Sequence, residues 1–140
     1  MASRKRVLVI EDHDDSRELL AALLRREGFD VVAYDRCKGA ELHLEASDID
    51  VALLDVRLPD RCGDDFAKEL RARCPKTMIV FITGEPLVAA LKVAVPGCFV
   101  IRKPIDVQVL LELLACLGAD AGYGAALPMT MDDQAQPDQM

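Results

Sequence analysis

The stretch that decides the fold is Val51-Ala52-Leu53-Leu54-Asp55-Val56-Arg57-Leu58-Pro59-Asp60. A short apolar run that ends at turn-forming residues is typical of a strand buried on both faces of a parallel sheet. Asp55 stands at the carboxyl end of this run. In open α/β sheets, ligands bind in the crevice outside the carboxyl ends of the strands. Asp55 is therefore predicted to lie at the functional edge of a sheet.

The same pattern recurs along the chain, where short apolar runs alternate five times with segments of helical periodicity. Asp14 or Asp15 is expected to cap the first helix. Five βα units with short connections predict one α/β domain, a parallel sheet with helices on both faces. The strands are expected at 7–10, 31–34, 51–54, 78–82 and 99–101, and the helices at 14–26, 39–46, 64–74, 87–95 and 106–117.

Composition narrows the class of protein. The 140 residues are 51% hydrophobic and 29% charged, which suits one globular domain. No apolar stretch is long enough to cross a membrane and no signal peptide follows Met1, so we expect a cytoplasmic protein without membrane association. A net charge of −7 argues against direct binding of nucleic acid. The five cysteines lack CxxC spacing and indicate free thiols.

The last part of the chain differs from the rest. Residues 119–140 contain Gly, Pro, Met, Gln and Asp without periodicity, which predicts a disordered tail or linker after a domain that spans residues 1–118. We expect no output domain after the last predicted helix. The extended tail favours a stand-alone protein over a piece of a longer one.

Polar residues follow four of the predicted strands at one edge of the sheet. Three carboxylates that meet there repel one another, and such a cluster persists mainly where a cation binds. Oxygen ligands suit Mg²⁺, and a carboxylate is also a nucleophile that forms aspartyl phosphate. The pattern predicts a Mg²⁺-assisted phosphoryl acceptor at Asp55, with Lys103 and Thr83 on the other phosphoryl oxygens. The residues are Glu11-Asp12, Asp55, Thr83-Gly84 and Lys103-Pro104.

These motifs, in this order, resemble those of the receiver domain of response regulators in two-component signalling, over about residues 5–118. The resemblance implies a flavodoxin-like, doubly wound α/β fold with a five-stranded parallel sheet in the strand order 2-1-3-4-5. It matches Glu11-Asp12 to the metal-binding pair, Asp55 to the phosphorylated Asp, Thr83-Gly84 to the switch hydroxyl and a small residue, and Lys103-Pro104 to the Lys before a cis-Pro.

The resemblance also implies partners and a mechanism. A sensor histidine kinase, a phosphotransfer protein or a small phosphodonor would phosphorylate Asp55. Thr83 would then turn inward, and the face formed by helix four, strand five and helix five would rearrange. Arg57 would offer its backbone carbonyl to the metal, and the side chains of Arg57 and Glu85 occupy positions that tune dephosphorylation in the family. Beyond self-phosphorylation and self-dephosphorylation, no enzymatic activity is implied.

The chain departs from the family pattern near its fifth strand. Val100 stands three residues before Lys103, where the family usually has Tyr or Phe, and Phe99 is beside it. The segment from Thr83 to Lys103 is also about two residues shorter than usual. The predicted Thr83 switch therefore lacks its usual aromatic partner.

Two other functions remain as alternatives. A haloacid-dehalogenase-type phosphatase also uses an Asp nucleophile, but it needs a second Asp two residues later, where this chain has Arg57. A receiver-like interaction module that takes no phosphate is kept open by Val100 and the short segment after Thr83. His13 adjoins the acidic pair, but we expect an exposed loop histidine because Mg²⁺ prefers oxygen.

The last predicted helix carries two apolar stripes. We expect one stripe to face the core and the other to form a contact surface for a homodimer or a partner, within the face of helix four, strand five and helix five. The expected core stripe is Val107, Leu110, Leu114 and Leu117, and the expected interface is Val109, Leu113 and Cys116.

Overall fold

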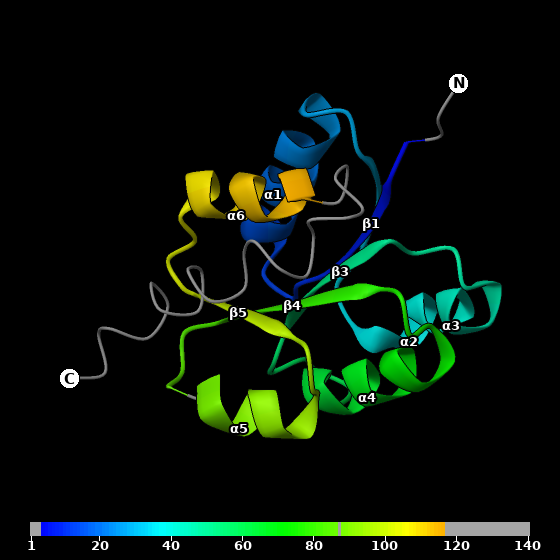
Figure 1. Cartoon of the computed structure of the whole chain (residues 1–140). Coiled ribbons are helices and arrows are strands. Elements are labelled where there is room, and N and C mark those ends of the chain that lie inside the picture. Colours follow the sequence, from blue (N-terminus) through cyan, green and yellow to red (C-terminus); the bar gives the residue numbers. More distant parts are fainter. Residues whose placement is uncertain (1–3, 87, 117–140) are drawn as a thin grey trace.

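The computed structural model describes residues 4–86 and 88–116. A parallel sheet runs through the centre of these residues, with its five strands in the order β2-β1-β3-β4-β5 (Figure 1). This order confirms the predicted flavodoxin-like fold. The strands are β1 (Arg6–Ile10), β2 (Asp30–Tyr34), β3 (Val51–Asp55), β4 (Met78–Thr83) and β5 (Phe99–Arg102). The predicted tail, residues 119–140, lies outside the described residues.

Helices cover both faces of the sheet (Figure 1). Side chains that alternate along each strand point to opposite faces, so the sheet contributes to two cores. Leu8 and Ile10 belong to one core, whereas Val7 and Val9 belong to the other. None of the helices in the described ranges is both long and apolar enough to cross a membrane. One face carries α1 (Asp14–Arg26) and α6 (Val107–Ala115), and the other carries α2 (Cys37–Ala40), α3 (Leu42–Ala46), α4 (Gly63–Arg73) and α5 (Val88–Ala94).

Two predictions about helix boundaries were wrong. The expected helix at 39–46 is divided between two short helices, α2 and α3, and the backbone inside α2 is non-helical at Lys38, with a ψ of 174°, and at Gly39, with a φ of 44°. The residue that caps α1 is His13, whose Nδ1 accepts a hydrogen bond from the backbone N–H of Ser16 at 3.4 Å. The predicted capping residues Asp14 and Asp15 lie in the first turn of α1.

The predicted interface on α6 also needs correction. Leu113 is fully buried, together with Leu110 and Leu114, because these residues form the face that packs against the sheet and α1. Val109 is half-buried against the same core. Val107, which was expected in the core, is 40% exposed. The stripe Val109, Leu113 and Cys116 is therefore not a surface stripe, and Leu117 lies outside the described residues.

A cluster of charged side chains, here called the Arg6 cluster, lies at the amino-terminal end of β1. The Arg6 guanidinium contacts Asp30 at 3.0 Å and Asp48 at 2.6 Å, and its backbone N–H donates to Asp50 at 2.8 Å. The other oxygen of Asp48 lies 2.9 Å from Nδ1 of His43, which is buried. These contacts attach α3 and the loop before β3 to the end of β1.

Candidate functional site

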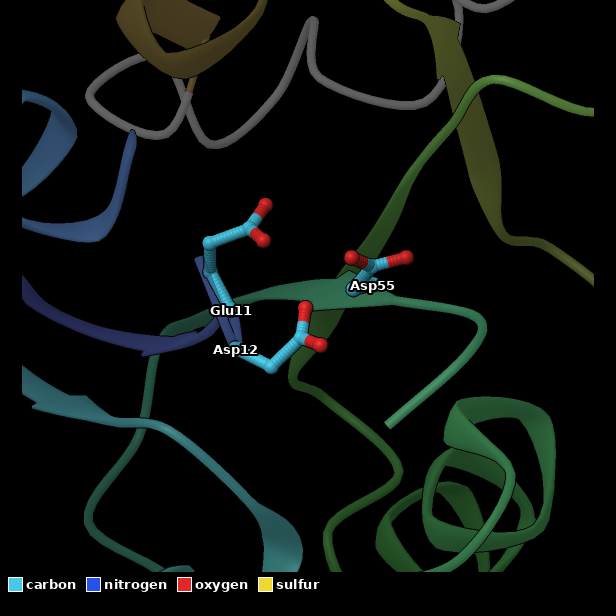
Figure 2. Close-up of side chains that lie close together, drawn as sticks. All are labelled: Glu11, Asp12 and Asp55. Carbon is cyan, nitrogen blue, oxygen red and sulfur yellow. The ribbon is translucent and has the colours of Figure 1, made fainter. Parts of the chain in front are cut away.

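Three carboxylates meet at the carboxyl-terminal edge of the sheet. Glu11 and Asp12 directly follow β1, and Asp55 is the last residue of β3, the strand that pairs with β1. Their oxygens lie within 4.8 Å of one another, and Figure 2 shows the side chains around a shared space. Glu11 is buried, Asp55 is half-buried and Asp12 is exposed. The topology thus brings together acids that are distant in sequence.

Lys103 supplies the positive charge of the site. Its Nζ lies 3.2 Å from Oε1 of Glu11 and 3.2 Å from Oδ2 of Asp55. Burial alone would lower the pKa of Lys103, but the charges of Asp55 and Glu11 outweigh this effect and raise it. The Lys103–Pro104 peptide bond is cis, as the resemblance implies. Lys103 therefore remains charged and neutralises part of the carboxylate cluster.

Glu11 and Asp12 differ in their surroundings. Burial raises the pKa of Glu11 and the charge of Asp55 adds to this, while the backbone N–H of His13, 3.0 Å away, and Lys103 oppose it. By contrast, the Asp12 carboxylate makes no hydrogen bond or ion pair within the ranges that the structure describes. The cluster thus presents one unpaired, exposed carboxylate beside two partly neutralised ones.

The loop between β3 and α4 folds back onto Asp55. The backbone N–H of Gly63 donates to the carbonyl of Val56 at 2.7 Å, and Arg57 and Cys62 form an antiparallel bridge. A Cβ at position 63 would lie 2.0 Å from the carbonyl oxygen of Asp55, so only glycine fits there. This close approach fixes the backbone on which the Asp55 carboxylate stands.

Asp60 attaches the same loop to the beginning of α2. Its two carboxylate oxygens accept hydrogen bonds from the backbone N–H groups of Cys37 at 3.0 Å and Lys38 at 2.8 Å. Although burial alone would raise the pKa of Asp60, these hydrogen bonds lower it overall. Asp60 therefore holds the loop in place as an ionised carboxylate.

Beside the carboxylates, β4 ends at Thr83 and is followed by Gly84 and Glu85. The buried Thr83 accepts a hydrogen bond on Oγ1 from the backbone N–H of Glu85 at 3.1 Å. Its carbonyl accepts from the backbone N–H of Lys103 at 2.8 Å, which fixes the two strand ends relative to each other. At the exposed Gly84, an added Cβ would meet nothing closer than the Cβ of Lys103 at 4.0 Å. The small residue leaves space next to the site.

No aromatic side chain takes the place that the family usually gives to Tyr or Phe, as far as the described residues show. Val100 is buried opposite Phe81 in the core beneath α4 and α5. Phe99 belongs to the core on the other face, because side chains alternate along β5. Phe99 therefore does not substitute for the missing aromatic residue.

The structure brings together most of the residues that the sequence indicated. Glu11, Asp12, Asp55 and Lys103 share one cluster, and Thr83 ends the strand that pairs with β3. The exposed His13 is not one of the clustered ligands, as expected. Sequence reasoning gave no role to three residues that support the site: Asp60, Gly63 and Arg17, whose guanidinium donates to the carbonyl of Glu11 at 3.0 Å.

Comparison with known proteins assigns most of the chain to the family that the motifs resemble. The model of the response regulator receiver domain matches residues 7–115. The response regulator protein PilR of Pseudomonas aeruginosa is 35% identical over 115 residues, which cover 81% of this chain and 26% of PilR. The chain thus spans about a quarter of the length of this relative.

Solved structures agree with the sequence match. A response regulator receiver protein from Pseudomonas putida is 29% identical, with a TM-score of 0.72 over 82% of this chain and 98% of that one. The beryllofluoride-activated NtrC4 receiver domain, solved as a dimer, is 26% identical, with a TM-score of 0.69 over 79% of this chain and 93% of that one. With the carboxylate cluster, the lysine and the strand order in place, the chain belongs to the response regulator receiver domain family.

Proposed function

We propose that this protein accepts a phosphoryl group on Asp55 and thereby switches an interaction surface. One Asp55 oxygen would bond to phosphorus as the bond between phosphorus and the donor breaks, and the donor would leave with that electron pair. The observation that carries the proposal is the contact of Lys103 with Asp55 at 3.2 Å beside an unpaired Asp12. Attack by a carboxylate needs no general base.

Mg²⁺ is the proposed cofactor. The site offers oxygen ligands only, and the unpaired Asp12 carboxylate faces the space between Glu11 and Asp55 (Figure 2). Glu11, Asp12, Asp55 and the backbone carbonyl of Arg57 would hold the ion. When bound, the ion supplies positive charge to the incoming phosphoryl oxygens. These donor atoms fit a hard divalent cation.

Two further residues would contact the phosphoryl group. Lys103 would neutralise one oxygen, and the Thr83 hydroxyl would donate to another after its side chain turns toward Asp55. In the present structure Thr83 accepts from Glu85 and is buried, so this turn breaks an existing hydrogen bond. Gly84 leaves room for the movement.

A protein phosphodonor is supported by an apolar groove that opens beside the site. The groove has a volume of about 270 Å³ and lies between α1 and the segment after β5, with Glu11 and Lys103 in its lining. Leu19 lines it and is 72% exposed. We propose that a histidine kinase or phosphotransfer protein docks there and presents its phosphohistidine to Asp55. Cytoplasmic location remains part of this proposal.

Turnover as a haloacid-dehalogenase-type hydrolase is disfavoured by the residue two positions after Asp55. That chemistry needs a carboxylic acid there as general acid. The residue is Arg57, and its guanidinium contacts Glu85. We therefore propose a phosphoryl acceptor and not a phosphatase.

Dimerisation through the face of α5, β5 and α6 remains a prediction. The NtrC4 receiver domain was solved as a dimer in its beryllofluoride-activated form. On α5 of this chain, Ala89 and Ala90 are exposed and Val93 is 82% exposed, and the one charged residue of this helix, Lys92, is half-buried. Sedimentation that finds only monomer at high concentration, with and without beryllofluoride, would contradict it.

The direct test is incubation with Mg²⁺ and acetyl phosphate, read by intact mass. We expect the wild type to gain one phosphoryl group and Asp55→Asn to gain none. Asp65→Asn, which removes an exposed carboxylate from the first turn of α4, is the matched control and should behave like the wild type. A wild type whose mass does not change would refute the proposed function.

A further inference from the structure

One ion pair connects the two loops that flank the site. The guanidinium of Arg57 donates through Nε and Nη2 to the carboxylate of Glu85, with a distance of 3.2 Å between Nη2 and Oε1. Arg57 belongs to the loop between β3 and α4, and Glu85 follows β4. The pair is bidentate, which fixes the relative orientation of its two planar groups. The ion pair therefore joins the segment that follows β3 to the segment that follows β4.

Each partner of the pair is also bound to a group that phosphorylation would change. The backbone N–H of Arg57 donates to Oδ1 of Asp55 at 3.3 Å. The backbone N–H of Glu85 donates to Oγ1 of Thr83 at 3.1 Å. The ion pair thus links the carboxylate that would accept the phosphoryl group to the hydroxyl that would bind it.

A phosphoryl group on Asp55 would compete with Glu85 for Arg57. Guanidinium binds phosphate oxygens in the same bidentate geometry as carboxylate, and the phosphoryl group carries more negative charge. The same charge repels the carboxylate of Glu85. The Arg57 side chain is 78% exposed, so little packing prevents it from changing partners.

We propose that the Arg57–Glu85 ion pair is a latch that phosphorylation opens. Arg57 leaves Glu85 and binds the phosphoryl group on Asp55. Glu85, which is then repelled and no longer held, frees the segment that carries Thr83. This inference rests on the proposed function of Asp55. It assigns the two side chains opposite effects, since Glu85 opposes the phosphorylated state and Arg57 favours it.

The opposite effects separate a latch from a passive brace. If the pair only stabilised the two loops, removing either partner would have the same consequence. If it is a latch, Glu85→Gln favours the phosphorylated state because it releases Arg57, whereas Arg57→Gln disfavours it. The pair is exposed, and ion pairs of this kind correspond to about a two- to fivefold change in an equilibrium constant.

The experiment is a double-mutant cycle on the full chain. The beryllofluoride concentration that half-saturates the protein in excess Mg²⁺ is measured for the wild type, Arg57→Gln, Glu85→Gln and the double variant. We expect a decrease of about two- to fivefold for Glu85→Gln and an increase for Arg57→Gln. The effect of Glu85→Gln should shrink when Arg57 is absent, and high salt should weaken it.

Glu69→Gln is the matched control, because it removes one charge from another exposed pair, Arg61–Glu69, at 3.0 Å. Changes of the same sign in both single variants, an additive cycle, or a Glu85→Gln effect no larger than that of Glu69→Gln would overturn the latch alone. If beryllofluoride does not bind the wild type, or binds equally to Asp55→Asn, the proposed function fails and the latch fails with it.

Discussion

The two ends of β1 carry similar charges in different arrangements. At the amino-terminal end, Arg6 contacts Asp30 and Asp48 and its backbone binds Asp50, so each of these carboxylates has a partner. At the carboxyl-terminal end, three carboxylates surround Lys103, which contacts only two of them. One cluster is closed within the protein, and the other leaves Asp12 without a partner among the described residues.

This difference shows how similar residues serve stability in one place and binding in another. A closed cluster gains from its own contacts, and losing one member leaves the others without compensation. An open cluster keeps mutual repulsion that a bound cation would relieve. The same substitution, a loss of one carboxylate charge, should therefore have opposite effects on stability at the two ends of β1.

The largest expected effect tests the closed end. Arg6→Gln removes the cation that neutralises Asp30 and Asp48 and should lower the free energy of unfolding by about 1–2 kcal/mol, because two partly exposed ion pairs each contribute up to about 1 kcal/mol. Urea unfolding measures this change. The control Arg26→Gln removes a charge from the exposed last turn of α1 and should cost less than about 0.5 kcal/mol. Equal losses in the two variants would contradict the closed cluster.

The next effect depends on pH. Burial would raise the pKa of Asp48, but the hydrogen bond and charge of His43, together with Arg6, lower it below its ordinary value of 3.8. A lowered carboxyl pKa stabilises the fold above the unfolded value, and this stabilisation disappears as the pH falls through the folded pKa. Asp48→Asn should therefore cost about 1 kcal/mol at pH 7, because the pair is partly exposed, and progressively less near pH 3.

Urea unfolding of the wild type and Asp48→Asn at several pH values measures that difference. A cost that does not change with pH would show that the contribution of Asp48 does not depend on its charge. Asp65→Asn serves as the reference for an exposed carboxylate.

The smallest effect tests the open end. Without metal, Asp12→Asn should raise the free energy of unfolding by about 0.5 kcal/mol, because it removes an unpaired charge beside Glu11 and Asp55. With Mg²⁺ at ten times the dissociation constant, the wild type should gain about 1.4 kcal/mol and the variant much less. Unfolding measured with and without Mg²⁺ tests both. If Asp12→Asn lowered the free energy of unfolding without metal, the contrast drawn between the two ends of β1 would be wrong.

Local sequence patterns were sufficient for a parallel α/β sheet and for most of the candidate site, whereas the strand order came from the family resemblance. The apolar runs before Glu11 and Asp55 predicted two paired strands, and the shared edge of a parallel sheet placed their acids together. Local patterns could not predict the residues that hold the site in place. Asp60 binds backbone groups of α2, and Gly63 approaches the Asp55 carbonyl, and both contacts depend on how distant segments pack.

The errors on the helices have equally physical causes. Two apolar stripes on one helix do not reveal which of them faces the sheet, and in the structure Leu113 lies with Leu110 and Leu114 in the core that α6 shares with α1 and the strands. The non-helical backbone inside α2 depends on the positive φ of Gly39, where the ring of Tyr34 lies 3.1 Å from the place of a Cβ. Periodicity alone contains no information about either contact.

The loop from Val56 to Gly63 is closed by its own backbone contacts and attached to α2 through Asp60. A loop restrained in this way has few conformations to lose when an ion or a phosphodonor arrives. Little binding free energy would then be spent on ordering the chain around Asp55. The consequence is kinetic as well, because a chain that is already arranged needs no slow rearrangement before a signal is received.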